Sequence, residues 1–213
     1  MEVQTGGESS ANASLYPAPE CLAGDTATVA HTKRKVLAAT ADLMERLRFG
    51  SVTMDAVARA SGVSRSTIYR HWPSREALVL EAFTLRTEEL TEVDDSGDAF
   101  ADLTEHLSKL AYRLNFGGAA STVAGLIARA IEDPDFAQHY RSTLVRSRRR
   151  GFLSILRRGQ VHGQITQDAD LSTVIDCLYG AIHHRLLVSK QPIDDRFITS
   201  LVHFVSTGLR PAP

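Results

Sequence analysis

The sequence predicts an all-α protein with a short N-terminal helical domain followed by a larger helical domain. From residue 28 onward, apolar residues recur every three or four positions, which is the spacing of one helix face. Capping residues, Gly and Pro divide this pattern into segments of helical length. No segment alternates convincingly between apolar and polar residues, so we expect no sheet.

The beginning of the chain differs from the rest. Residues 1–27 are rich in Gly, Ser, Ala, Thr and Pro without periodicity, which predicts a disordered tail. A first helix is expected over 28–47, and Gly50 is expected to end it. The apolar stripe of this helix comprises Leu37, Ala41, Met44 and Leu47.

Three shorter helices follow, each after a favoured N-cap residue. The caps are Thr53, Ser64 and Ser74, and the breakers between them are Gly62 and Pro73. These signals predict helices between Thr53 and Gly62, over 65–71 and over 74–92. The remaining helices are expected over 98–115, 119–132, 134–159, 169–189 and 194–208.

Charge is unevenly distributed along the chain. The formal net charge is −1, yet the stretch from Lys33 to Arg75 holds nine basic and three acidic residues, a local net of +6. A basic module joined to an acidic body suggests an anionic partner such as nucleic acid. A solvated charged face is the alternative explanation of such a run.

The cysteines and the apolar segments indicate in which cellular compartment the protein is expected. Cys21 and Cys177 lie in different segments without metal-type spacing, which fits a reducing compartment. The N-terminus lacks the basic and apolar regions of a signal peptide, and no apolar run approaches 18 residues. We therefore expect a cytoplasmic protein without a membrane partner.

The stretch from Ala56 to His71 predicts a helix-turn-helix. Two short helices meet at Gly62, where a positive φ costs little. Val57, Val63 and Ile68 are placed to be buried. The rest of the second short helix is polar or basic, so its outer face can enter the major groove of DNA and donate to bases and phosphates.

The run TMDAVARASGVSRSTIYRHWPSREAL, from Thr53 to Leu78, resembles the DNA-binding segment of TetR-type regulators. The Gly-Val-Ser turn, the Tyr-x-His-aromatic ending and the Ser-Arg-Glu-x-Leu that follows occur together at the family's spacing. The sequence departs from the family at Ser66, where Gly is usual, and at Arg75, where Lys is usual. Neither change removes a donor, so base preference is affected rather than DNA binding.

The resemblance implies a role for each matching residue. The implied phosphate contacts are Thr53, Tyr69, His71 and Arg75. The implied readers of base edges are Arg65, Ser66, Thr67 and Arg70. His71 as a cation at a helix end is the alternative to its phosphate role. Trp72 is interpreted as a core residue that fixes the third helix against the fourth.

The resemblance also implies a second helical domain that dimerises and binds a small molecule. The two last predicted helices are apolar over much of their circumference and need burial on more than one side. The expected homodimer interface comprises Val174, Leu178, Ala181, Ile198, Leu201 and Val205. The alternative is that both helices are central core helices of one chain.

An effector pocket is expected among the middle helices, for a small, largely apolar ligand. The candidates for its lining are Leu110, Tyr112, Phe116, Leu126, Ile127, Arg129, Phe136, Tyr140, Phe152 and His183. Each could instead be ordinary core. The basic run from Arg146 to Arg150, with Arg157 and Arg158, is interpreted as a solvated helix face rather than a second DNA surface.

Other classes of protein find less support. The sequence has no Gly-x-Ser-x-Gly, no phosphate-binding Gly-rich loop and no HExxH, so neither an enzyme nor a cofactor is predicted. His183 and His184 are adjacent and point about 100° apart, which does not suit one metal ion. A helical adaptor that lost DNA binding would show a damaged third helix, which is intact here. The sequence therefore favours a ligand-responsive regulator, a repressor before an activator, that binds a palindromic operator as a homodimer.

Overall fold

The computed structural model of the chain describes residues 27–88 and 95–210. Within these ranges every regular element is helical and no strand occurs, which confirms the predicted all-α fold. The tail expected over residues 1–27 lies outside the described residues except for Ala27, where the first helix begins. Residues 89–92 of the predicted fourth helix also lie outside them.

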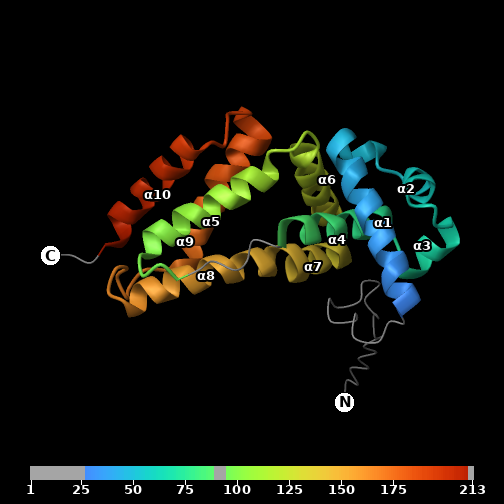
Figure 1. Ribbon diagram of the computed structural model, residues 1–213. Helices are drawn as coiled ribbons and strands as arrows, with labels where there is room; N and C mark the ends of the chain where they lie inside the picture. The colour runs from blue at the N-terminus through green and yellow to red at the C-terminus, as the bar shows by residue number, and fades with distance from the viewer. Residues whose placement is uncertain (1–26, 89–94, 211–213) are drawn as a thin grey trace, which may run out of the picture.

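The N-terminal elements form one end of the molecule. Figure 1 shows the first three helices together at this end, with the fourth passing from them into the body. The elements are α1 (Ala27–Arg46), the 3₁₀ turn η1 (Phe49–Ser51), α2 (Met54–Ser61), α3 (Arg65–His71) and α4 (Arg75–Glu88). Because α4 packs against α1 and also against the later helices, it connects the two parts of the chain.

The later helices form the body. They are α5 (Ala99–Leu114), α6 (Ala119–Glu132), α7 (Pro134–Tyr140), η2 (Arg141–Val145), α8 (Arg146–Val161), α9 (Leu171–His183), η3 (His184–Ser189) and α10 (Asp195–Leu209). Helices α7 and α8 continue each other through the π-helical turn η2, and they form the long rod along one side of Figure 1. Helix α5 packs against α8 and against α10, so it lies between them.

The first helix ends earlier than predicted. It stops at Arg46, and Gly50 lies in η1 without the positive φ of a helix-ending glycine, so that expectation was wrong. The backbone N–H of Phe49 instead donates to the Ser121 hydroxyl of α6 at 2.9 Å. The turn after α1 is therefore stabilised by Ser121, which is distant in sequence, and not by the conformation of Gly50.

One apolar core runs through the described parts of the chain. Val57 of α2 and Ile68 of α3 are fully buried in it, as predicted, whereas Val63 is only half-buried. Phe83 of α4 is also fully buried, and its ring centroid lies 6.4 Å from that of Phe116, just before α6. Because α4 packs against α1 and also against α6 and η2, a shift of α4 must disturb packing in both parts of the chain.

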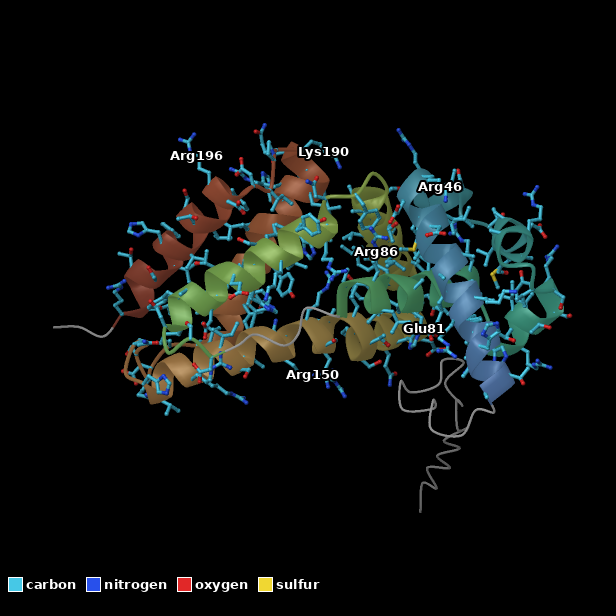
Figure 2. All side chains as sticks on the ribbon, in the orientation of Figure 1. Arg46, Glu81, Arg86, Arg150, Lys190 and Arg196 are labelled. Atoms are coloured by element: carbon cyan, nitrogen blue, oxygen red, sulfur yellow. The ribbon has the colours of Figure 1, made fainter. Side chains whose placement is uncertain are left out.

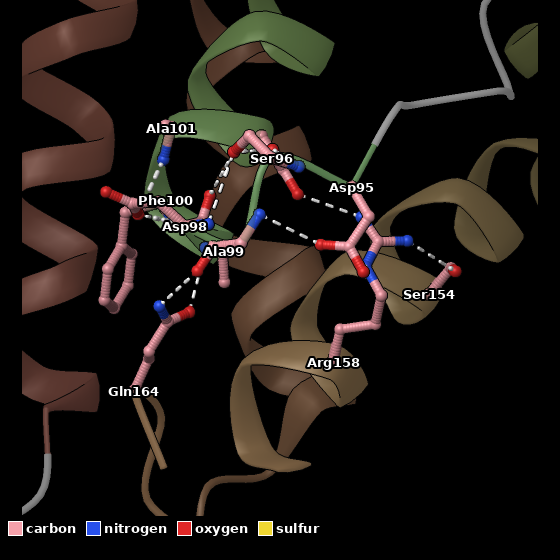
Figure 3. Close-up of polar contacts among 11 residues, drawn as sticks. Asp95, Ser96, Asp98, Ala99, Phe100, Ala101, Ser154, Arg158 and Gln164 are labelled. Carbon is pink, nitrogen blue, oxygen red and sulfur yellow. Dashed lines mark hydrogen bonds and ion pairs between the residues drawn. The ribbon is translucent and has the colours of Figure 1, made fainter. Parts of the chain in front are cut away.

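A polar network joins the start of α5 to α8 (Figure 3). Asp98 caps α5 by accepting from two backbone N–H groups of the first turn, at 2.9 and 3.1 Å. Arg158 of α8 donates to the buried Asp102 carboxylate at 2.9 Å, and the Ser96 hydroxyl donates to the same carboxylate. Burial by itself would raise the pKa of Asp102, but the hydrogen bonds from Ser96 and Arg158 hold it below its usual value.

Among residues 27–88 and 95–210, no single helix is both long and apolar enough to cross a membrane. Helices α5 and α6 reach that composition only as a pair, across a bend of 94°.

Candidate DNA interface and effector cavity

Helices α2 and α3 form the predicted helix-turn-helix. Gly62 joins them in the left-handed conformation, with a φ of +67°, which glycine adopts without the steric cost of a side chain. Thr53 caps α2 and Ser64 caps α3, each by accepting from a backbone N–H in the first turn at 3.2 Å. Ile68 is buried on the inner side of α3, so the opposite side of this helix faces outward.

The outward side of α3 carries the donors that the sequence assigns to base reading. Arg65, Ser66, Tyr69 and Arg70 are exposed there, and Thr67 is half-buried. Arginine and hydroxyl side chains suit hydrogen bonding to base edges and phosphates. The structure therefore places these five positions on one short helix and leaves four of them exposed, while their contacts with DNA remain predictions.

Arg65 is held by contacts that DNA can replace. Its Nη1 pairs with Asp55 at 2.9 Å, and both side chains are more than half exposed. Its guanidinium also lies 5.9 Å from the ring centroid of Tyr69. An exposed ion pair contributes about 0–1 kcal/mol, so exchanging Asp55 for a base edge or a phosphate costs little.

Two further predicted phosphate contacts lie at helix ends, Thr53 before α2 and His71 at the end of α3. Thr53 is exposed at the N-terminus of α2, where backbone N–H groups and the helix dipole favour an anion. His71 is half-buried at the end of α3, and its ring centroid lies 5.7 Å from that of Trp72. Their contacts with phosphate remain predictions.

Arg75 makes contacts inside the protein. Its guanidinium donates to the Phe49 carbonyl at 2.8 Å and to the Glu76 carboxylate at 2.6 and 3.0 Å. It also lies 4.3 Å from the ring centroid of Phe49. In this conformation Arg75 joins the start of α4 to η1. To make its predicted phosphate contact, Arg75 would have to break some of its hydrogen bonds to Phe49 and Glu76.

Trp72 has the core role predicted for it. The indole is buried, and its Nε1 donates to Glu81 Oε2 of α4 at 2.6 Å. Glu81, labelled in Figure 2, belongs to α4 and lies next to α1. Burial raises the pKa of Glu81, against the opposing effects of the Trp72 bond and the Lys33 charge. The residue that ends α3 is therefore fixed to α4.

A cavity of about 280 Å³ lies between the η2–α8 part of the rod and α9. Its lining consists of Tyr140, Leu144, Val145, Arg148, Arg149, Asp176, Tyr179, Gly180 and His183. Tyr140 and His183 belong to the predicted pocket set, and the structure brings them together here. Burial raises the pKa of Tyr140 and Tyr179 and lowers the pKa of His183, so all three are neutral near pH 7.

The other predicted pocket residues lie elsewhere. Five of them lie in the apolar core or pack against it, namely Leu110, Leu126, Ile127, Phe136 and Phe152. Phe116 lies beneath the Arg86 guanidinium, 4.4 Å from its ring centroid. Arg129 forms an ion pair with Asp133 one turn further on. Tyr112 is 81% exposed on α5.

Arg148, Tyr179 and Leu144 line the cavity without having been predicted to do so. The basic run of α8 was interpreted as a solvated face, and Figure 2 shows Arg150 pointing away from the body in that manner. Arg148 instead turns inward, because it stands four residues after Leu144 and four before Phe152 on the buried stripe. This four-residue spacing could have indicated that Arg148 faces inward. Arginine, however, is rarely found on the buried side of a helix.

The residues predicted for the dimer interface fall into two groups. Those buried in the core of the chain itself are Val174, Leu178 and Ile198. Those partly exposed are Ala181, Leu201 and Val205. Phe204, beside them on α10, is 79% exposed, so an apolar surface does lie along this part of α9 and α10.

Comparison with known proteins covers both parts of the chain. Residues 36–82 match the family model described as bacterial regulatory proteins, tetR family, and residues 93–205 match the tetracyclin repressor-like C-terminal domain. An uncharacterized HTH-type transcriptional regulator of Bacillus subtilis, YdeS, is 29% identical over 179 residues, covering 84% of this chain and 90% of YdeS.

Solved structures of transcriptional regulators resemble this chain as well. The TetR family transcription regulator SCO0332 is 34% identical, with a TM-score of 0.73 over 85% of this chain and 100% of the other. FadR of Bacillus subtilis, solved with stearoyl-CoA, shares the fold at 16% identity, with a TM-score of 0.63 over 83% of this chain and 99% of FadR. Each of these proteins is named as a transcriptional regulator, in agreement with the prediction of a regulator rather than an enzyme. The chain belongs to the TetR family of DNA-binding transcriptional regulators.

Proposed function

We propose that this regulator is a repressor that binds a palindromic operator as a homodimer and leaves it when a small effector is bound. The observation that carries the proposal is the outward side of α3, where exposed arginines and hydroxyl groups lie opposite the buried Ile68. A protein bound in this way occludes a promoter. We further propose that it acts in the cytoplasm and that residues 28–74 and 75–213 form its two functional domains.

The homodimer is proposed from the apolar surface of α9 and α10. Phe204 is 79% exposed, and Leu201 and Val205 are partly exposed beside it. Burying apolar surface contributes about 25 cal/mol per Å², so covering this surface with a second copy stabilises the pair. A two-fold dimer presents two copies of α3 to half-sites about 34–36 Å apart. Val174, Leu178 and Ile198 are buried within the chain itself, so the proposed interface does not include them.

The effector site is proposed in the cavity between η2, α8 and α9. Its volume of about 280 Å³ lies just below the usual range of ligand pockets, which is about 300 to 1,000 Å³. A small, largely apolar effector therefore suits it better than a large one. Helix α4 packs against both η2 and α1, so a ligand that binds the two states of α4 with different affinities changes DNA affinity.

Selection of bound sequences from a random DNA pool tests the DNA-binding part of the proposal. Enrichment of a palindrome is the expected result, and its half-site spacing should equal about one helical turn or a multiple of it. The proposal would be contradicted if no sequence is enriched and DNA binding is lost at moderate salt. Such a result would mean that the protein makes only non-specific contacts with phosphates.

Sedimentation analysis tests the dimer. Phe204→Glu places a charge in the proposed interface and is expected to shift the protein toward the monomer. Tyr112→Glu is the matched control, because Tyr112 is 81% exposed on α5. A Phe204→Glu protein that stays fully dimeric would exclude this surface.

A further inference from the structure

The cavity contains a cation, Arg148, for which the described part of the chain supplies no carboxylate partner. Arg148 is half-buried on the inner side of α8. Its Nη2 donates to the Thr87 hydroxyl of α4 at 3.3 Å, and its guanidinium lies 5.2 Å from the ring centroid of Phe83. Its Nε is buried without a hydrogen-bond acceptor. Within residues 27–88 and 95–210, no ion pair joins Arg148 to a carboxylate.

The neighbouring groups leave this charge uncompensated. Arg149, at the mouth of the cavity, pairs with Asp176 and donates to the Ser172 hydroxyl at 2.6 Å, so the carboxylate of the lining already has a partner. Tyr140, Tyr179 and His183 contribute neutral polar groups near pH 7. The lining thus carries two arginines and one carboxylate, which leaves one net positive charge, located at Arg148.

A half-buried arginine without a carboxylate partner among the described residues is costly for the folded protein. Desolvation of the guanidinium lowers the pKa of Arg148, which shows that its surroundings disfavour the charge. Polar groups that are buried without a full set of partners concentrate at functional sites rather than in structural cores. The guanidinium presents a planar pair of donors, which a carboxylate can accept in a bidentate geometry.

We propose that the effector is a small organic carboxylate whose acid group pairs with Arg148 and whose apolar body lies against Tyr140, Leu144 and Tyr179. This inference rests on the proposed role of the cavity as the effector site and adds the chemical class of the ligand. One negative charge matches the one unbalanced positive charge. The volume of about 280 Å³ limits the ligand to a compact aromatic or short aliphatic acid.

The same contact supplies a route to the DNA-binding end. Arg148 reaches α4 through Thr87 and Phe83, and α4 also holds Glu81, which accepts from Trp72 at the end of α3. A carboxylate that takes the guanidinium away from Thr87 changes the packing of α4. Thr87→Val removes the accepting hydroxyl and is expected to leave effector binding in place while reducing release from the operator.

The test uses the full chain and matched pairs of compounds. A panel of small carboxylic acids, such as benzoate and hexanoate, is compared with the corresponding carboxamides, which have nearly the same shape without the charge. Ligand binding is measured by thermal shift and by titration calorimetry on the wild type and on Arg148→Met. Arg150→Met is the matched control, because Arg150 is exposed on the same helix and points away from the body.

We expect acids from the panel to raise the melting temperature of the wild type and of Arg150→Met, and their carboxamides to have no such effect. Arg148→Met should weaken binding of the same acids by about tenfold or more. Without ligand, Arg148→Met should melt no lower than the wild type, since an apolar side chain replaces a buried unpaired charge. Arg148→Lys, which keeps the charge, should retain the preference for acid over amide at reduced affinity.

Other outcomes would overturn the inference. They are equal binding of acids and amides, equal binding of acids to Arg148→Met and the wild type, or a panel in which no acid stabilises the protein. If a neutral compound releases the wild type and Arg148→Met equally from the operator, the proposal that an effector controls DNA binding is retained. The proposal that the effector is a carboxylate is then rejected. If acids bind through Arg148 but never change operator affinity, the carboxylate-binding site at Arg148 is retained. The proposal that this site controls DNA binding is then rejected.

Discussion

Gly118 at the start of α6 lies directly against the backbone of Met44 in α1. A Cβ atom on Gly118 would come within 1.7 Å of the Met44 carbonyl oxygen and 2.9 Å of its carbonyl carbon. Both atoms belong to the main chain, so neither can move unless one helix shifts against the other. This contact fixes the body of the protein against the helix that supports the DNA-binding end.

Gly118→Ala is therefore expected to separate α6 from α1. Overpacking of this kind costs about 1–3 kcal/mol, and because α1 supports α2 and α3, operator affinity should fall as well. Urea unfolding and DNA titration measure the two effects. Gly208→Ala is the control, since a Cβ on Gly208 meets nothing within 4 Å. Equal stability of the two variants would contradict the close approach.

Gly62→Ala tests the turn of the helix-turn-helix. Its φ of +67° costs an L-residue about 1–2 kcal/mol, although nothing lies within 4 Å of the added Cβ. The expected fall in melting temperature is about 2–8 °C for a chain of this size. Gly50→Ala has equal space without a positive φ and should leave the melting temperature unchanged or slightly raised.

Arg65→Ala and Tyr69→Phe separate base reading from phosphate contact. Loss of an arginine that reads a base should cost about 1–3 kcal/mol on the selected operator and much less on random DNA. Loss of the Tyr69 hydroxyl should weaken binding to both DNAs by the same factor. Arg150→Ala should change neither affinity. If Arg65→Ala weakens both DNAs equally, Arg65 contacts phosphate instead.

Asp102→Asn tests the network between α5 and α8. The pKa of Asp102 is held below 3.8, so its carboxylate stabilises the fold at neutral pH, and this stabilisation is lost as the pH falls below about 4 through the folded-state pKa. At pH 7 the variant should be about 1–3 kcal/mol less stable than the wild type. The difference should shrink as acid protonates the wild-type carboxylate.

Urea unfolding at a series of pH values measures this dependence. Asp95→Asn provides the control, because Asp95 is 48% exposed and lies 3.4 Å from Arg158. Such an exposed pair contributes about 0–1 kcal/mol. A constant difference between Asp102→Asn and the wild type at every pH would show that the charge of Asp102 does not matter.

Much of the fold could be predicted because it depends on neighbours in sequence. Thr53 and Ser64 cap helices through bonds that close within three residues, and Gly62 adopts its positive φ for local steric reasons. The α7–η2–α8 rod spans 134–161, close to the predicted 134–159. The side of α3 that faces outward followed from the position of Ile68 alone.

The cavity could not be predicted in the same way. Of the positions expected to line it, Tyr140 and His183 do so, whereas Phe136 and Phe152 are equally aromatic but lie in the core. Helical periodicity shows which side of a helix is buried, but it does not show whether the space opposite is filled. Arg148 was assigned to solvent because its charge outweighed its position on the buried stripe.

The helices, their caps, the helix-turn-helix and the family could be inferred from the sequence, since all of these depend on residues a few positions apart. Three contacts follow from the packing of the helices and not from local sequence: Arg75 contacts Phe49, Gly118 lies against Met44, and Arg148 faces a cavity. Each of these contacts joins elements that the chain brings together from distant positions. Their geometry depends on how whole helices pack, which no local pattern of residues specifies.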